Sequence, residues 1–183
     1  PELTYVALRL KDDSIIVCAE GLREQMEQAI GRTGEEVARC SGAALEGVTL
    51  NHPFLDLTVP IILGDHVTTE AGTGCVHTAP GHGEDDFNVG RRYDLEVVVP
   101  VDHYGKFTDE AGPYAGLKAV PTNPLIVADL QASGHLLSDP SASVEHSYPH
   151  HSRCGRPLLF RATDQWFLSM AHDGLRERCL KAI

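Results

Sequence analysis

The sequence predicts an α+β fold with a β-barrel-like core and peripheral helices. Short runs of alternating or continuous apolar residues recur along the chain, as expected of β-strands. Only a few stretches have the apolar period of a helix. The 183 residues contain no internal repeat and no low-complexity tract, and they suffice for one domain with a sizeable core. Short strands mixed with a few helices favour the α+β class.

The N-terminal part is predicted to form a hairpin followed by a helix. Residues 4–10 alternate as a strand does, and residues 14–19 are the expected partner across the Lys11-Asp12-Asp13 turn. Apolar side chains share one face of a helix expected over residues 22–30. Further strands, separated by turns that contain glycine or proline, are expected at residues 37–40, 49–50 and 59–63.

A glycine-rich stretch, GTGCVHTAPGHGEDDF at residues 72–87, has the composition of a ligand site. It holds two histidines, three carboxylates, four glycines and one proline. Cys75 and Val76 are expected to end a buried strand. The following segment is expected to be an irregular turn, and the acidic residues from Glu84 to open a helix to residue 93, because acidic side chains favour the positive end of the helix dipole. We call residues 72–87 the central motif.

The second half of the chain has weaker periodicity. The run VVVP at residues 97–100 predicts a buried strand, and residues 102–116 an exposed loop or hairpin. Thr122 or Asn123 is expected to cap a helix that ends near residue 133. After a Ser/Asp/Pro linker at residues 138–143 the composition changes, and a strand at residues 158–161 and a final helix at residues 170–183 are expected.

Charge and cysteine content narrow the class of protein. A net charge of −11 argues against a broad phosphate-binding face for duplex nucleic acid, although a local basic edge for a few single-stranded nucleotides stays open. Five widely spaced cysteines without a CxxC pair indicate reduced thiols in a cytosolic protein. No apolar run reaches the roughly 20 residues of a membrane span. The start at Pro1 resembles no signal peptide, and we expect a piece excised from a longer protein.

Two side chains of the central motif are candidates for ligand contact. His77 would share a strand face with Cys75, where it either lines a pocket or is a core histidine bonded to a backbone carbonyl. Asp86 is ionised at neutral pH and can hold an ammonium group. The alternative is that either Asp85 or Asp86 caps the helix while the other is solvated.

Two groups of residues raise the question of a metal. His77, His82 and Asp86 have suitable ligand types, but their spacing fits no compact ligand pattern. A second group, His146, His150, His151 and Cys154, lacks a paired cysteine motif. We therefore expect no metal site. The chain contains neither a GxSxG nucleophile elbow nor a Walker loop, so the residues alone support a ligand pocket with an anionic anchor.

Taken together, the central motif strongly resembles the editing-domain motif of class I isoleucyl-tRNA synthetases of the bacterial type. This domain, connective peptide 1, is inserted in the Rossmann catalytic domain. Valyl and leucyl relatives share the Gly-Thr-Gly and the aspartate but carry other residues where His77 stands, which favours the isoleucyl branch. Segments that resemble the same family in the same order cover essentially the whole chain: HPF at 52–54, VPIILGDHV at 59–67, HSYP at 146–149 and FRATDQWF at 160–167.

The resemblance implies hydrolysis of valine mistakenly esterified to the isoleucine tRNA, and also of valyl-adenylate. Asp86 would hold the substrate α-ammonium group, and His77 would exclude isoleucine by size; these are the two implied catalytic residues. A positioned water, helped by a ribose hydroxyl, would attack the ester. The alternative is that His77 activates the water as a general base. The remaining motif would shape the pocket floor and seat the terminal adenosine, and the implied substrate-binding residues are Gly72, Thr73, Gly74, Thr78, Ala79, Pro80, Gly81, His82 and Asp85.

The resemblance also implies the surroundings of the chain. Residues 1–145 would be the core of the editing domain, and residues 146–183 would lead back toward the aminoacylation domain. Editing would need no cofactor, whereas ATP and Mg²⁺ would serve the aminoacylation domain of the parent enzyme, outside this chain. The implied partners are the 3′ end of tRNA(Ile), its valine moiety and the rest of the synthetase in cis. We expect a cytoplasmic monomer without membrane contact.

Two departures from the family pattern matter. A threonine-rich, Thr-Thr-Thr-Pro-Trp-type segment normally lies shortly before the position of Pro1 and is absent from this chain. We expect one wall of the pocket to be missing, which leaves a non-catalytic tRNA-end or amino-acid binding fragment as the alternative function. A metal-dependent hydrolase using His77, His82 and Asp86 is the third reading. At Ser152, relatives often have tryptophan.

Overall fold

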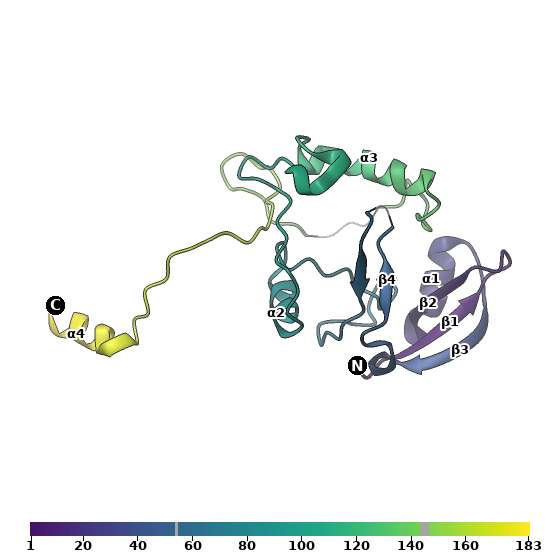
Figure 1. Cartoon of the computed structure of the whole chain (residues 1–183), viewed down its shortest axis with the longest axis horizontal. Coiled ribbons are helices and arrows are strands. Elements are labelled where there is room, and N and C mark those ends of the chain that lie inside the picture. The colour runs from purple at the N-terminus through teal and green to yellow at the C-terminus, as the bar shows by residue number, and fades with distance from the viewer. Residues whose placement is uncertain (54, 144–146) are drawn as a thin grey trace.

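The computed structural model describes residues 1–53, 55–143 and 147–183, and it confirms the α+β class (Figure 1). The strands are β1 (Thr4–Arg9), β2 (Ile15–Ala19), β3 (Glu35–Ser41), β4 (Thr49–Asn51) and β5 (Thr58–Pro60). The α-helices are α1 (Arg23–Ile30), α2 (Glu84–Arg92), α3 (Ala119–Ala132) and α4 (Leu175–Lys181). Short 3-10 helices are η1 (Glu20–Leu22), η2 (Gly42–Leu45), η3 (Asp109–Tyr114) and η4 (His172–Gly174).

The N-terminal part is an antiparallel sheet of order β2-β1-β3 with α1 packed against it. The predicted hairpin is confirmed: Leu10 N donates to Ser14 O at 2.8 Å across the turn. Along β1 the side chains of Val6 and Leu8 point inward and are almost completely buried. They pack with Cys18 of β2 and Met26 of α1, so alternate strand positions and one helix face form this core.

The strands β4 and β5 form a separate two-stranded sheet, which stands between the first sheet and α2 in the view of Figure 1. Among the described residues the five strands therefore form two sheets and do not close into a barrel. β5 ends at Pro60, three residues earlier than predicted, and beyond it Ile61 still exchanges backbone hydrogen bonds with Val48 and Gly47.

Three predicted strands are wrong. Residues 75–76, 97–100 and 158–161 join no sheet in the described part of the chain. Val76 is 55% exposed and Val98 43% exposed, so these apolar side chains do not belong to a strand buried in the core. The chain before residue 75 meets the free edge of β2 through one backbone hydrogen bond, from Ala19 N to Thr73 O, and no ladder follows from it.

The helix predictions are closer to the structure. α2 begins at Glu84 as expected. α3 begins at Ala119, so neither Thr122 nor Asn123 is its cap; the Thr122 hydroxyl lies inside the helix and donates to Lys118 O at 2.8 Å. The final helix is shorter than predicted, because only residues 175–181 are α-helical. The proposed domain boundary at residues 145/146 lies outside the described residues, as do Phe54 and His146.

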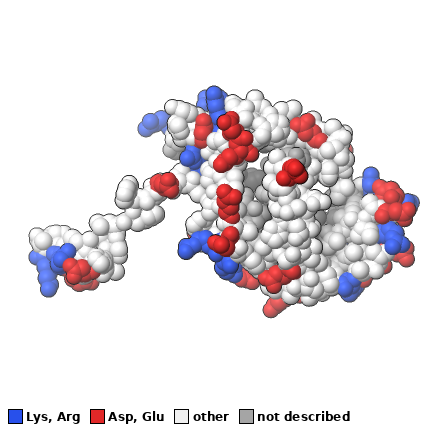
Figure 2. All heavy atoms as spheres, viewed as in Figure 1, with Lys and Arg blue, Asp and Glu red and all other residues white. Residues whose placement is uncertain are grey.

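Charged side chains cover the surface in mixed groups. On the face shown in Figure 2, Lys and Arg side chains lie in small separate groups among Asp and Glu side chains. The face in view therefore carries no broad basic patch of the kind that binds duplex phosphates. After residue 162 the chain leaves the body and runs as an extended arm to α4 (Figure 1).

The central motif rests on the edge of the three-stranded sheet near the end of β2. Ala19 N donates to Thr73 O at 2.8 Å, and the buried Tyr5 hydroxyl donates to Gly74 O at 2.6 Å. Burial raises the pKa of Tyr5, so its hydroxyl keeps the proton that it donates. Gly74 has φ of +76°, and a Cβ at this position would lie 2.6 Å from Ala19 Cβ. The motif and the sheet can approach this closely because residue 74 is glycine.

Replacing Gly74 by alanine is therefore expected to destabilise the fold more than replacing Gly72, which has φ of +80° but no atom within 4 Å of an added Cβ. Both variants place alanine in the left-handed region, at a cost of about 1–2 kcal/mol. Gly74→Ala adds a steric overlap with Ala19, of the order of 1–3 kcal/mol more. Urea unfolding of the two variants measures the difference, and equal losses would show that the contact with Ala19 does not restrict this position.

Candidate functional site

The central motif reaches from the first sheet to α2 without forming regular structure before residue 84. Like its beginning at residues 73–74, its end at residues 81–82 is held by hydrogen bonds and close packing. Gly81 is buried, and a Cβ there would overlap the carbonyl oxygen of Val98. Gly81 O accepts a hydrogen bond from Ala162 N at 2.7 Å, and His82 N donates to Ala79 O at 2.8 Å. The residues from Cys75 to Pro80 therefore form the middle part of the motif, between two ends that are held by hydrogen bonds and close packing.

The turn lies directly against α2. A Cβ on Gly90 would lie 2.7 Å from Pro80 Cγ, so glycine in the helix lets the proline ring pack against its backbone. Gly83 is the N-cap of α2, and Phe87 N donates to Gly83 O at 2.9 Å. The geometry of the turn is thus transmitted directly to the first turn of the helix.

The three acidic residues at the start of α2 have different surroundings. Glu84 and Asp85 are exposed, whereas Asp86 is half-buried. The Asp86 carboxylate folds back over Gly83, where its Oδ2 would lie 2.7 Å from an added Cβ. Among the described residues, no hydrogen bond or ion pair joins this carboxylate to a protein group. Asp86 is therefore available to a cationic ligand, and it lies at the end of a helix that favours negative charge.

His77 is exposed, so the alternative of a core histidine is wrong. It lies near His52, which precedes β5 in the chain and which the site prediction did not include. The pKa of His52 is lowered first by burial and second by the positive charge of His77. His52 Nδ1 also accepts a hydrogen bond from Leu55 N at 3.1 Å. Nothing in the local sequence pattern places His52 beside residue 77.

Residues 160–162 also belong to the surroundings of the motif. His82 Nδ1 lies 2.8 Å from Phe160 O, across 78 positions of the chain. Between the two bonded residues lies Arg161, whose Nε and Nη1 atoms are buried without a hydrogen-bond partner among the described residues. The strand predicted at residues 158–161 is thus a segment that contacts the motif, and no local signal in the sequence indicates this contact.

The remaining motif residues have mixed exposure. Gly72 and His77 are open to solvent, and Thr73, Thr78, Ala79 and Pro80 are half-buried. The Thr73 hydroxyl accepts from Cys75 N at 3.2 Å, which holds the chain just after Gly74. The predicted residues thus lie along one continuous turn, with His77 in its middle part and Asp86 at its end.

A metal centre is not assembled in the part of the chain that the structure describes. No group of three or more His, Cys, Asp and Glu side chains there could hold a metal ion, including His77, His82 and Asp86. In the second candidate group, Cys154 Sγ lies 3.5 Å from His151 Nδ1, and His146 is outside the described residues. None of the described helices combines the length and the apolarity that crossing a lipid bilayer requires.

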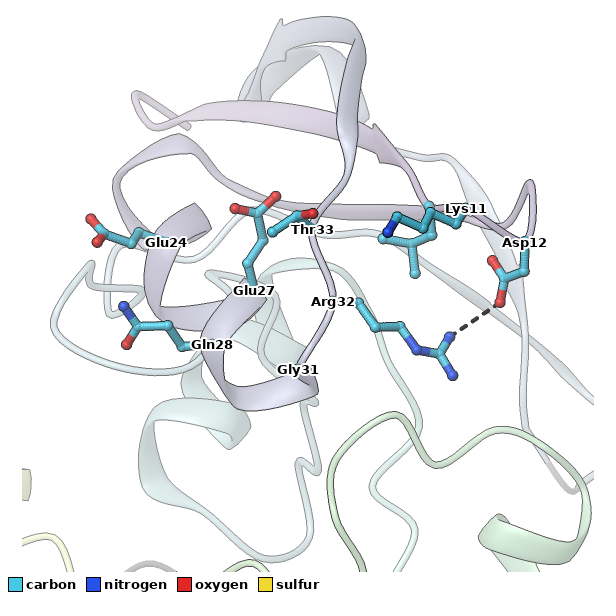
Figure 3. Close-up of a pocket in the computed structure, with 9 residues that line it drawn as sticks. Lys11, Asp12, Glu24, Glu27, Gln28, Gly31, Arg32 and Thr33 are labelled. Carbon is cyan, nitrogen blue, oxygen red and sulfur yellow. Dashed lines mark hydrogen bonds and ion pairs between the residues drawn. The ribbon is translucent and has the colours of Figure 1, made fainter.

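The hollow drawn in Figure 3, of about 670 Å³, lies elsewhere. It is bordered by α1 and by the turn between β1 and β2, at the opposite end of β2 from Ala19. Its Arg32 and Asp12 side chains are paired with each other at 3.1 Å and are more than half exposed. These surface charges neutralise one another, so we assign the hollow no role in the site.

Comparisons with known proteins agree on one kind of domain. Residues 17–123 match a family model described as "Leucyl-tRNA synthetase, editing domain". The chain is 50% identical over 183 residues to an isoleucine–tRNA ligase of Carboxydothermus hydrogenoformans, covering 100% of this chain and 19% of that protein. It is 46% identical over 184 residues to an isoleucine–tRNA ligase of Kosmotoga olearia, covering 100% of this chain and 20% of that protein.

A solved structure shares the fold. The crystal structure described as "GlLeuRS-CP1" matches with a TM-score of 0.58 and 15% sequence identity, over 74% of this chain and 73% of that one. The chain spans about a fifth of the length of the curated relatives it matches. The central motif and His52 lie inside the family match at residues 17–123, and the segment 160–162 lies outside it.

The environment of His52 predicts a pH-dependent stability. Because its pKa in the folded chain lies below the usual 6.5, the unfolded chain takes up a proton at higher pH than the folded chain does. The stability that neutral His52 contributes is therefore complete above 6.5 and is lost as the pH falls from there through the lowered pKa. Protonation of Nδ1 would also remove the acceptor for Leu55 N.

In His52→Asn the side-chain oxygen accepts the same N–H and does not titrate, so this part of the acid destabilisation should disappear. Urea unfolding at about pH 7.5 and about pH 5.5 measures the acid destabilisation as the difference between the free energies of unfolding at the two pH values. His135→Asn, at an exposed position, is the matched control and should keep the wild-type change. A wild-type change in His52→Asn would contradict the assignment.

Proposed function

Because the chain belongs to the family of aminoacyl-tRNA synthetase editing domains, we propose that it hydrolyses valine mistakenly esterified to the isoleucine tRNA. The identity to isoleucine–tRNA ligases along the whole chain supports the isoleucyl branch. Deacylation of the tRNA is the principal reaction of the proposal, and valyl-adenylate is a second substrate of the same chemical class. The observation that carries the proposal is the half-buried Asp86 carboxylate, which faces no protein cation in the described structure.

Asp86 binds the α-ammonium group of the esterified amino acid in this proposal. A charge-assisted hydrogen bond between a carboxylate and an ammonium group is stronger than a neutral one and fixes the position of the donor. Two bonds separate the ammonium nitrogen from the ester carbonyl carbon, so holding the nitrogen also places the reacting carbonyl. In the proposal the bound amino acid extends from Asp86, at the end of the motif turn, toward His77.

His77 acts on the side chain of the amino acid. Binding alone separates isoleucine from valine poorly, since one methylene in an apolar pocket is worth only about 1–3 kcal/mol, a general estimate for which this enzyme family is the standard illustration. A second site that rejects the larger side chain removes the smaller, wrong product. In the proposal the exposed imidazole of His77, in the middle part of the motif, contacts the side chain and excludes the extra carbon of isoleucine.

Water is the nucleophile of the proposed reaction. The motif contains no serine or cysteine activated by a base: Cys75 has its pKa raised by burial, which disfavours the thiolate. A water molecule held beside the fixed ester, with a ribose hydroxyl of the terminal adenosine as a hydrogen-bond partner, completes the reacting group. The motif backbone from Gly72 to Gly74 and from Thr78 to His82 seats this adenosine.

The longer protein completes the function in our proposal. The aminoacylation domain, which ligates isoleucine to tRNA with ATP and Mg²⁺, lies in cis and delivers the 3′ end to this domain. Editing itself proceeds without a cofactor. The threonine-rich segment of the family supplies the wall of the pocket opposite to the central motif.

The Asp86 role predicts a specific loss of deacylation. Asp86→Asn should lower kcat/KM for valyl-tRNA(Ile) by roughly 10- to 100-fold, the equivalent of one hydrogen bond to a charged group. Glu84→Gln is the matched control, because neutralising the exposed carboxylate at the start of the same helix should leave kcat/KM within about threefold of wild type. The assay compares the 183-residue chain with the full-length enzyme that includes the threonine-rich segment.

Activity in neither form of the wild type would refute the editing proposal, and binding of the tRNA end without hydrolysis would establish the non-catalytic alternative. Equal effects of Asp86→Asn and Glu84→Gln would remove Asp86 from the ammonium site while leaving the activity in place.

The His77 role predicts a change of specificity. His77→Ala widens the pocket, so isoleucyl-tRNA(Ile) should become a substrate and the preference for valyl-tRNA should fall by about 10- to 200-fold. His172→Ala removes an exposed imidazole from the C-terminal arm and should keep the wild-type preference. Deacylation rates with the two charged tRNAs measure the ratio, and unchanged rejection of isoleucine by His77→Ala would exclude the size role.

A further inference from the structure

We propose that His82 is a positioning residue that ties the motif turn to residues 160–162 and thereby sets the place of Asp86. This inference goes beyond substrate binding by the motif, although its activity test rests on the proposed function. Two hydrogen bonds join the segments: Ala162 N donates to Gly81 O at 2.7 Å, and His82 Nδ1 donates to Phe160 O at 2.8 Å. The bond from Ala162 joins backbone atoms only, whereas the bond to Phe160 O comes from the His82 side chain and can therefore be changed by mutation.

The partner of His82 determines its tautomer. A backbone carbonyl oxygen only accepts hydrogen bonds, so Nδ1 of His82 carries the proton. In the neutral ring Nε2 is then the unprotonated nitrogen. The bond to Phe160 therefore survives in both charge states of the imidazole, which suits a permanent tie.

The turn has little room to move as long as this tie is in place. Gly81 is enclosed on one side by the backbone at Val98 and on the other by Ala162. His82 N is bonded to Ala79 O inside the same turn. Loss of the His82 side-chain bond frees one of the two contacts with residues 160–162, and the turn can then shift toward solvent.

The effect reaches Asp86 through three neighbouring residues. Gly83 follows His82, serves as the N-cap of α2 and accepts the hydrogen bond of Phe87 N at 2.9 Å. The Asp86 carboxylate folds over Gly83, so its position depends on the backbone there. A displaced turn therefore displaces the group that holds the substrate amine, and the ester carbonyl with it.

Two variants of similar shape test the tie. Asparagine at residue 82 places an amide N–H near the position of Nδ1 and can donate to Phe160 O, whereas aspartate has the same shape and no N–H. His82→Asn should have a roughly tenfold higher kcat for valyl-tRNA(Ile) than His82→Asp and His82→Ala, with KM similar among the three variants, as expected for one hydrogen bond. Urea unfolding of each variant separates this loss from a general loss of folding.

Two further measurements do not depend on activity. The ¹⁵N–¹H spectrum of the wild-type imidazoles should show His82 as the Nδ1–H tautomer, and amide exchange at Ala162 should be faster in His82→Asp than in His82→Asn. The Nε2–H tautomer, or equal kcat and equal exchange for these two variants, would overturn the inference. An inactive wild type would instead refute the proposed function, while the tautomer and the exchange rates would still decide the role of His82.

Discussion

The carbonyl oxygen of Gly74 accepts a 2.6 Å hydrogen bond from the buried hydroxyl of Tyr5, and the position of the central motif depends on this contact. Tyr5 belongs to the central strand of the best-packed sheet, so its hydroxyl is a fixed donor. The left-handed backbone of Gly74 turns the carbonyl toward it and brings the chain against Ala19. The same core that stabilises the N-terminal fold therefore also sets the start of the site.

A second anchor acts at the other end of the motif. Gly81 and His82 are bonded to residues 160–162, which lie far along the chain, and Pro80 packs against Gly90 of α2. Between the anchors the motif is irregular, with residues 75–77 exposed and residues 78–80 half-buried, and this part carries His77. An irregular segment held at both ends by packed structure is a common way to present ligand-contacting side chains without burying unsatisfied backbone groups.

The two candidate side chains occupy different electrostatic surroundings. Asp86 stands at the N-terminus of α2, where the helix dipole favours its negative charge, and it forms no ion pair among the described residues. His77 lies near His52, whose burial already disfavours protonation. The site thus offers a carboxylate to an ammonium group at one end and imidazole surfaces to an uncharged side chain at the other. This division suits a substrate that carries both groups, as an aminoacyl ester does.

Local patterns in the sequence were sufficient for several features. The alternation of residues 4–10 and 14–19 around a polar turn predicted the hairpin, and the acidic residues after Gly83 predicted the start of α2, because both signals act between neighbours. The motif residues likewise identified the family. The tertiary structure alone decided that Cys75–Val76 and residues 97–100 join no sheet, since a strand needs a continuous ladder of hydrogen bonds with a partner as well as apolar side chains. It also placed His52 near His77 and joined His82 to Phe160, across 78 positions. No local signal encodes such contacts, because they form only when the elements between them have packed.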